Sequence, residues 1–124
     1  MAHFDVFNGD ADGLCALQQL RLAEPREAVL VTGVKRDIAL LARVPAQQGD
    51  TVTVLDVSMA RNREALEGLL TRGVRVEWFD HHFAGEPLVH PGLRSFLDAA
   101  PGVCTSVLVD RHLRGAHRAW AVVG

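Results

Sequence analysis

The sequence predicts an α/β domain built on a parallel β-sheet. Short apolar runs alternate along the chain with stretches whose apolar residues recur at helical spacing. This alternation is typical of βαβ units, in which helices cover both faces of a set of parallel strands. The length of 124 residues suits one core. We therefore expect a single domain over residues 1–124, with one sheet flanked by helices on both faces.

Four runs of apolar and β-branched residues are expected to form the strands. They cover residues 3–8, 28–33, 51–58 and 74–80. The passage over residues 85–102 is rich in proline and glycine, which favour turns. We expect that passage to be a loop.

The clearest helix is expected over residues 61–72. Its apolar residues fall on one face, and Gly73 ends it. Its charged residues, among them Arg61, are expected to face solvent. Further helices are expected over residues 13–24, 37–44 and 105–113, with a last helical stretch near the end of the chain.

Composition excludes several classes of protein. The net charge of −2 provides no general basic surface, so a nucleic acid would have to bind a local patch. Cys15 and Cys104 lie far apart without the spacing of a zinc site, and we expect both to be buried, reduced thiols. The sequence has neither an apolar run long enough to cross a membrane nor a recognisable signal peptide, so we expect a cytoplasmic protein without membrane contact.

Acidic and histidine residues gather where the expected strands end. Asp10 and Asp12 follow the first strand, Asp56 lies near the end of the third, and the D-H-H sequence at 80–82 ends the fourth. The carboxyl ends of parallel strands meet at one edge of a sheet, where ligands usually bind. Carboxylates at that density repel one another unless a cation neutralises them. A mixture of carboxylates and imidazoles suits Mn²⁺ or Fe²⁺ better than Ca²⁺.

The loop after the first strand has two further interpretations. Asn8, Asp10 and Asp12 alternate as in a calcium-binding EF-hand loop, but a strand precedes them and Gln19 stands where that loop needs glutamate. The two aspartates also match the nucleophile loop of haloacid-dehalogenase-like phosphatases, which usually carry threonine or valine where Leu14 stands here. We do not expect a calcium-binding loop. The haloacid-dehalogenase-like phosphatase is kept as a less favoured alternative.

Three motifs together resemble the DHH phosphoesterase superfamily, which includes RecJ-like nucleases, oligoribonucleases and manganese pyrophosphatases. They are NGDADG at 8–13, TVLDVS at 53–58 and FDHH at 79–82. Their order, spacing and placement at strand ends all agree with the family, and the resemblance covers essentially the whole chain. It implies the Rossmann-like, three-layer DHH fold.

The resemblance also implies which residues bind metal. Asp10 and Asp12 resemble ligands of two separate metal ions, and Asp56 resembles the carboxylate that bridges the ions. His81 resembles a direct ligand. The family implies two Mn²⁺ ions, with Mg²⁺ or Fe²⁺ as alternatives, which activate a water molecule and bind the phosphoryl oxygens.

Two residues beside the ligands resemble catalytic residues of the family. Asp80 resembles the carboxylate that orients His81, and His82 resembles the residue that faces the substrate phosphate.

Four other residues are candidates for binding the substrate. Lys35 and Arg36 follow the second strand on the same rim as the carboxylates, although an ordinary solvated loop explains them equally well. Thr105 and Ser106 would present a helix N-terminus to a phosphate, although an ordinary N-cap role is as good an explanation.

The implied activity is hydrolysis of a phosphodiester or phosphoanhydride bond. The implied substrate is a phosphorylated small molecule or a single-stranded oligonucleotide. Two departures from the family favour an alternative, a catalytically weak metal-binding, nucleotide-binding or regulatory module. Asn8 is neutral where many relatives have a stronger ligand, and the sequence contains neither the later aspartate motif nor the C-terminal substrate-binding domain. We therefore expect an incomplete DHH domain that binds Mn²⁺ but turns over slowly.

Remaining polar and aromatic residues have simpler expected roles. His3 and Asp5 are expected to be solvated, and Trp78 and Phe79 are expected to pack in the core.

Overall fold

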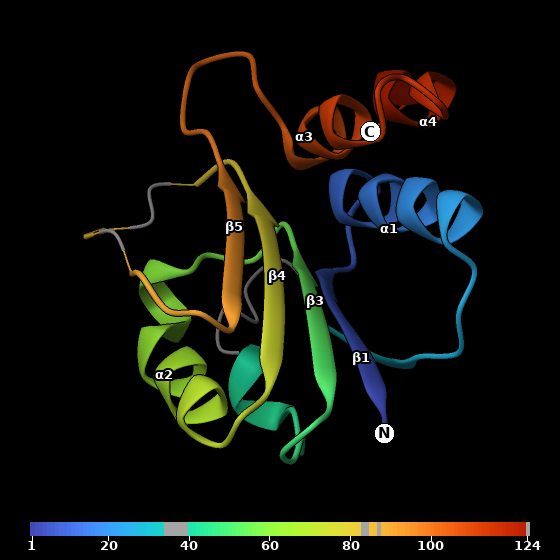
Figure 1. The fold of residues 1–124 in the computed structure, drawn as a ribbon. Helices are drawn as coiled ribbons and strands as arrows, with labels where there is room; N and C mark the ends of the chain where they lie inside the picture. Colours follow the sequence, from blue (N-terminus) through green and yellow to red (C-terminus); the bar gives the residue numbers. More distant parts are fainter. Residues whose placement is uncertain (34–39, 83–84, 87, 124) are drawn as a thin grey trace.

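The computed structural model describes residues 1–33, 40–82, 85–86 and 88–123. Within them lies one five-stranded, all-parallel sheet with the strand order β2-β1-β3-β4-β5 (Figure 1). The predicted α/β class is confirmed. The strands are β1 (His3–Asn8), β2 (Val29–Gly33), β3 (Thr51–Leu55), β4 (Arg75–Asp80) and β5 (Leu93–Leu97).

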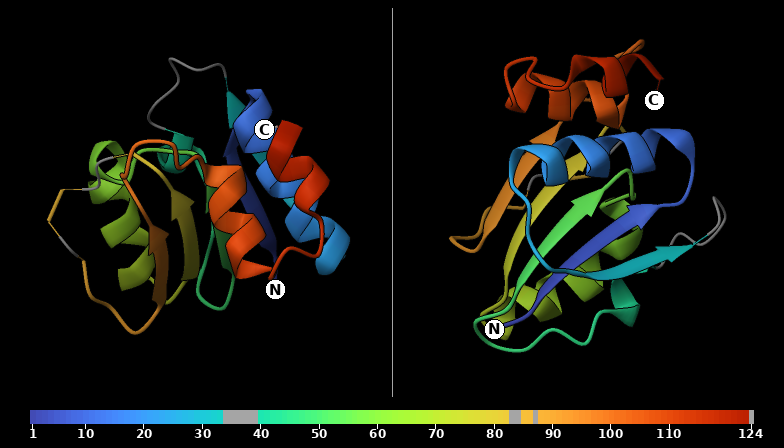
Figure 2. Two further views of the ribbon diagram at one scale, coloured as in Figure 1. Left: turned by 90° about the horizontal axis from the view of Figure 1, so that it is seen from above. Right: turned by 90° about the vertical axis from the view of Figure 1, so that its right-hand side faces the viewer.

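Helices cover both faces of the sheet (Figure 2). On one face lie α1 (Ala11–Ala23), α3 (Thr105–His112) and α4 (Arg118–Val123), with α3 and α4 packed against α1. On the other lie α2 (Arg63–Thr71) and two 3₁₀ turns, η1 (Leu40–Arg43) and η2 (Ala60–Asn62). None of the helices in the described part of the chain is long and apolar enough to span a membrane.

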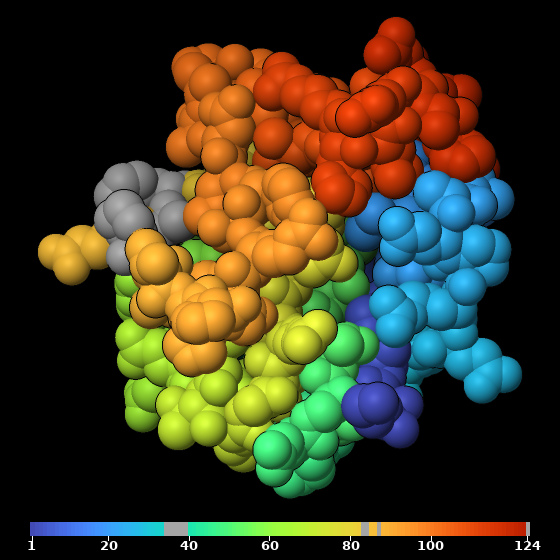
Figure 3. Space-filling view, viewed as in Figure 1, coloured from blue at the N-terminus to red at the C-terminus, as the bar shows by residue number. Residues whose placement is uncertain are grey.

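Two apolar clusters follow from the alternation of side chains along the strands. Val6, Val54 and Trp78 point to the face covered by α2 and η1. Their sequence neighbours Phe7, Leu55 and Phe79 point to the opposite face, toward α1 and α3. Trp78 and Phe79 are fully buried, so their expected core role is confirmed. The space-filling view looks at the β5 edge of the sheet, where β5 reaches the surface between α2 on one side and α1, α3 and α4 on the other (Figure 3).

The expected elements differ from the structure in three places. The third strand ends at Leu55, three residues before its expected end at 58, because the backbone turns at Asp56. The expected loop over 85–102 contains β5, a partly exposed edge strand without a continuous apolar run. Of the expected helix over 37–44, the described residues form only the turn η1.

Strand order determines where a ligand can bind. Helix α1 connects β1 to β2 across one face of the sheet, toward one edge. Helix α2 connects β3 to β4 across the other face, toward the opposite edge. Because α1 and α2 lie on opposite faces, a crevice is expected between the carboxyl ends of β1 and β3. The acidic segments after β1 and β3 therefore flank the switch point of a doubly wound sheet.

Candidate metal centre

The loop that follows β1 brings two aspartates to this edge. Asp10 is the N-cap of α1, and its Oδ1 accepts a hydrogen bond from the Gly13 N–H at 2.9 Å. Asp12 lies in the first turn of the helix. A Cβ atom on Gly13 would lie 2.0 Å from the carbonyl oxygen of Asn8. Only glycine therefore lets α1 start this close to β1, which places both carboxylates over the end of the strand.

Asp12 also contacts the start of α3 and the end of β4. Its Oδ1 accepts from the Ser106 N–H at 2.8 Å and its Oδ2 from the Thr105 N–H at 3.1 Å. The Nε2 atom of His81 lies 3.5 Å from the same Oδ2. Burial alone would raise the pKa of Asp12, but the backbone hydrogen bonds from Ser106 and Thr105 outweigh it and the pKa is lowered. Asp12 is therefore a carboxylate at neutral pH.

Asp56 follows β3 in an uncommon backbone conformation. Its φ is 61°, in the left-handed region that residues other than glycine seldom adopt. Two hydrogen bonds from β4 hold this turn: the Asp56 N–H donates to the Phe79 carbonyl at 3.0 Å, and the Trp78 indole donates to the Val57 carbonyl at 2.9 Å. The buried carboxyl group accepts from the Thr105 hydroxyl at 3.1 Å. Strain of this kind persists where the surroundings hold the backbone, and it is common at functional sites.

The surroundings of Asp56 strongly favour its neutral form. Burial is the largest cause, and the negative charges of Asp12, Asp10 and Asp80 add to it, so the pKa of Asp56 rises to about 9. A divalent cation would reverse this preference, because a metal ligand must be deprotonated.

The two histidines after β4 have different partners. His81 Nε2 lies 3.1 Å from Asp56 Oδ1, and His82 Nδ1 lies 2.6 Å from Asp80 Oδ1. The expectation that Asp80 orients His81 is therefore corrected: the Asp80 side chain contacts His82, because alternate residues of an extended segment point to the same side. Burial raises the pKa of Asp80, although His82 partly offsets this effect.

The site has the composition of a metal-binding site. The residues Asp56, Asp80, His81 and His82 each offer a ligand atom, all within 4.8 Å of one another, so this group could hold a metal ion. Beside them lies a pocket of about 530 Å³ that Asn8, Asp10 and Asp12 also line. Asn8 Oδ1 and Asp80 Oδ2 are buried and have no hydrogen-bond partner in the described part of the chain. Buried oxygen atoms without a partner, next to carboxylates and imidazoles, fit a divalent cation.

The structure brings the four predicted metal ligands together. Asp10, Asp12, Asp56 and His81 all line this pocket. Their contacts come from the ends of three strands that are far apart in sequence. Their individual roles toward a metal remain predictions.

The predicted substrate-binding residues do not all join the pocket. Lys35 and Arg36 lie outside the described residues. Thr105 and Ser106 are fully buried, and their N–H groups donate to the Asp12 carboxylate rather than to an open surface. A phosphate would have to displace Asp12 to reach them. The N-cap alternative is also corrected, because Cys104 is the N-cap of α3 and Asp12, from α1, accepts the first N–H groups of that helix.

Two buried polar residues were not recognised in the sequence. Asp5 is completely buried and His3 nearly so, which shows that their expected solvation was wrong. The Arg21 guanidinium donates to Asp5 at 3.0 and 3.2 Å, and His3 Nε2 lies 2.8 Å from Asp5. The alternation of β1 is the available signal, since Asp5 and Phe7 share the face that α1 covers.

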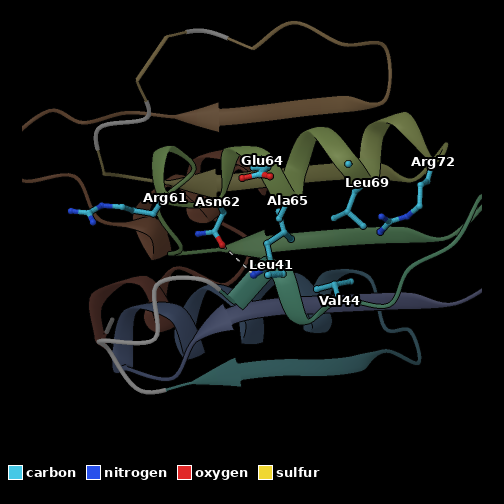
Figure 4. Close-up of a pocket in the computed structure, with 10 residues that line it drawn as sticks. Leu41, Val44, Arg61, Asn62, Glu64, Ala65, Leu69 and Arg72 are labelled. Carbon is cyan, nitrogen blue, oxygen red and sulfur yellow. Dashed lines mark hydrogen bonds between the residues drawn. The ribbon is translucent and has the colours of Figure 1, made fainter.

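A second, smaller groove lies beside the metal centre. Its volume is about 460 Å³, and it runs between η1 and α2 (Figure 4). Its floor is apolar, with Leu41, Val44 and Leu69, while Arg61 and Arg72 lie on its rim. Among the described residues that line the groove, Glu64 is the one carboxylate and no histidine occurs, so the metal centre is the better candidate for a catalytic site.

Both cysteines are free thiols as expected, and Cys15 is buried. The expected burial of Cys104 is corrected, because that residue is only half-buried. Burial raises the pKa of Cys15, which makes that thiol unreactive.

Comparison with known proteins identifies no family for this chain. No protein-family model matches it, and no curated protein matches its sequence significantly. The assignment of a function therefore depends on the arrangement of Asp10, Asp12, Asp56 and the D-H-H segment around one pocket.

Proposed function

We propose that this chain is a metal-dependent phosphoesterase domain of the DHH type, which hydrolyses phosphodiester or phosphoanhydride bonds in nucleotides, oligonucleotides or polyphosphates. One observation supports it most: Asp12, Asp56 and His81 converge at the switch point of the sheet. Their order in the chain and their placement at strand ends match the resemblance described above.

The carboxylates and His81 would hold the metal. Two Mn²⁺ ions, with Mg²⁺ or Fe²⁺ as alternatives, would polarise the phosphoryl oxygens and make a water molecule more acidic. Asp56 would be a ligand, because its Oδ1 lies 3.1 Å from Nε2 of His81 and its charge is unfavourable unless cations are present. The family resemblance implies that it would bridge the two ions. Asp10 and Asp12 would each face one ion.

His82 is suited to contact the substrate. Its Nδ1 is held by the buried Asp80 at 2.6 Å, and its side chain is 46% exposed at the pocket. The Asp80 contact fixes the ring orientation and leaves Nε2 available to a phosphate or a leaving group.

A module that binds metal or nucleotide without efficient turnover is the second candidate. Both Asp12 oxygens already accept backbone N–H groups, and the Asn8 side chain is neutral. A weakly held second ion would leave binding intact and reduce catalysis.

The test combines metal binding with hydrolysis. We expect the wild-type chain to bind Mn²⁺ and to hydrolyse bis(p-nitrophenyl) phosphate only when Mn²⁺ is present. The Asp56→Asn variant should lose both properties, and Glu27→Gln, on the exposed turn before β2, should keep them. Mn²⁺ binding without hydrolysis would favour the binding module, and absence of Mn²⁺ binding would contradict both the phosphoesterase and a metal-binding module.

A further inference from the structure

Arg61 is an arginine at the edge of the acidic pocket. It lies in η2 and lines the 530 Å³ pocket together with Asp10, Asp56 and His82. The side chain is exposed, and it makes neither a hydrogen bond nor an ion pair with any residue that the structure describes. The helical periodicity indicated only a solvated charge at this position, and the pocket is what distinguishes Arg61 from the other charges of the segment.

The backbone around Arg61 is fixed. Met59 is buried in the core, and Asn62 is 3% exposed. The Asn62 side chain donates to the Ser58 carbonyl at 2.8 Å and accepts from the Leu41 N–H at 3.2 Å, which joins η2 to η1. Figure 4 shows the Arg61 side chain extending away from Leu41, beyond the carboxyl ends of the strands. The anchored neighbours therefore direct the guanidinium toward the open side of the metal centre.

The guanidinium does not serve to neutralise the carboxylates. An ion pair with Asp10, Asp12 or Asp56 would place the charged atoms within 4.0 Å, and no such pair with Arg61 occurs in the described part of the chain. Those carboxylates are occupied by backbone N–H groups, the Thr105 hydroxyl and His81. Arg61 consequently keeps its planar set of donors available, and this geometry is the one that binds phosphate oxygens in pairs.

We propose that Arg61 binds the non-bridging oxygens of the substrate phosphate and so selects substrates that carry an anionic phosphoryl group. This inference rests on the proposed function, which places that phosphate between the metal ions and His82. Arg61 also lines the groove along α2, so it separates the reacting phosphate from the space available to the rest of the substrate.

Arg72 provides a matched control. It is an exposed arginine on the rim of the same groove, but it does not line the acidic pocket. Its Nε donates to the Ala46 carbonyl at 3.3 Å. Substitution of Arg72 therefore removes the same charge without changing the metal centre.

The experiment measures binding of inorganic phosphate to the Mn²⁺-loaded protein by isothermal titration calorimetry. We expect Arg61→Ala to weaken phosphate binding by about 10- to 100-fold, the usual effect of losing charged hydrogen bonds. Arg61→Lys should restore part of the affinity, and Arg72→Ala should behave as wild type. Mn²⁺ affinity without phosphate should be unchanged or slightly higher in Arg61→Ala. Equal phosphate affinity in wild type and Arg61→Ala, or equal losses in Arg61→Ala and Arg72→Ala, would overturn the assignment.

A second measurement separates this inference from the proposed function. With bis(p-nitrophenyl) phosphate, Arg61→Ala should raise KM much more than it lowers kcat, whereas loss of a metal ligand lowers kcat. If the wild type binds Mn²⁺ and phosphate but does not hydrolyse the diester, the phosphoesterase proposal fails, and the phosphate titrations still decide the role of Arg61. If the wild type binds no phosphate with or without Mn²⁺, the role of Arg61 is refuted.

Discussion

The Nε2 atom of His81 lies 3.1 Å from Oδ1 of Asp56, although 25 positions separate the two residues in the sequence. This contact joins the ends of β3 and β4. It brings an imidazole to a carboxyl group whose charged form is disfavoured by burial and by its acidic neighbours. The stability and the metal response of the protein should therefore depend on the protonation of Asp56.

We expect the metal-free protein to lose stability as the pH rises. The pKa of Asp56 is about 9 in the folded chain, against an ordinary value of 3.8. Between these values the folded state binds more protons than the unfolded state, so raising the pH lowers the free energy of unfolding. The raised pKa of Asp80 acts in the same direction. In Asp56→Asn the free energy of unfolding should depend less on pH above pH 4.

Thermal denaturation from pH 5 to pH 9 in the presence of a chelator measures this effect. At pH 8 the Asp56→Asn variant should have a higher melting temperature than the wild type. At pH 5 the two melting temperatures should be closer together. Parallel curves for the two proteins would contradict the raised pKa.

Metal binding should release protons from the site. Because Asp56 must lose its proton to bind a cation, Mn²⁺ affinity should rise with pH between about 6 and 9. Calorimetric titrations of Mn²⁺ in two buffers with different ionisation enthalpies count the protons released. Mn²⁺ should also raise the melting temperature by mass action in the wild type and in Glu27→Gln, and much less in Asp56→Asn. If Mn²⁺ raised the melting temperature of Asp56→Asn as much as that of the wild type, Asp56 would be excluded as a metal ligand.

Gly13→Ala should be strongly destabilising. Its Cβ atom would lie 2.0 Å from the Asn8 carbonyl oxygen, so α1 would have to move away from β1. We expect a loss of roughly 2–4 kcal/mol together with weaker Mn²⁺ binding. Gly68→Ala is the control, because the nearest atom to its Cβ, at 3.8 Å, belongs to the flexible Arg72 side chain. That helix-interior change should stabilise by about 0.5–1 kcal/mol. Urea denaturation compares the two, and equal stability of Gly13→Ala and wild type would disprove the close approach.

Trp78→Phe should loosen the turn that carries Asp56. The substitution removes the indole donor of the 2.9 Å hydrogen bond to the Val57 carbonyl and leaves that buried acceptor without it. A cost of about 1–3 kcal/mol and weaker Mn²⁺ binding are expected. Trp120→Phe, at a position 41% exposed on α4, should change neither property. Normal Mn²⁺ affinity in a destabilised Trp78→Phe would limit Trp78 to a packing role.

Much of the fold could be predicted from the sequence because its signals are local. Alternating apolar runs predicted the parallel sheet, and the helix over residues 61–72 required only its own periodicity. Strand β5 was missed, because Leu93–Leu97 is an edge strand whose pairing with β4 depends on distant residues. Exposure was also misjudged for Asp5, since its burial depends on Arg21 and on the position of α1.

For the candidate metal centre, the sequence alone determined which residues gather at the strand ends, since parallel strands bring their carboxyl ends to one edge. Which of these residues contact one another depends on the packing of the folded chain. The folded chain brings the Asp80 carboxyl group to His82 and the first N–H groups of α3 to Asp12, and it brings Arg61 to the pocket. The physical reason is that residue type and strand position are encoded locally. Hydrogen-bond partners and pKa values, by contrast, depend on side chains that only packing brings within a few ångströms.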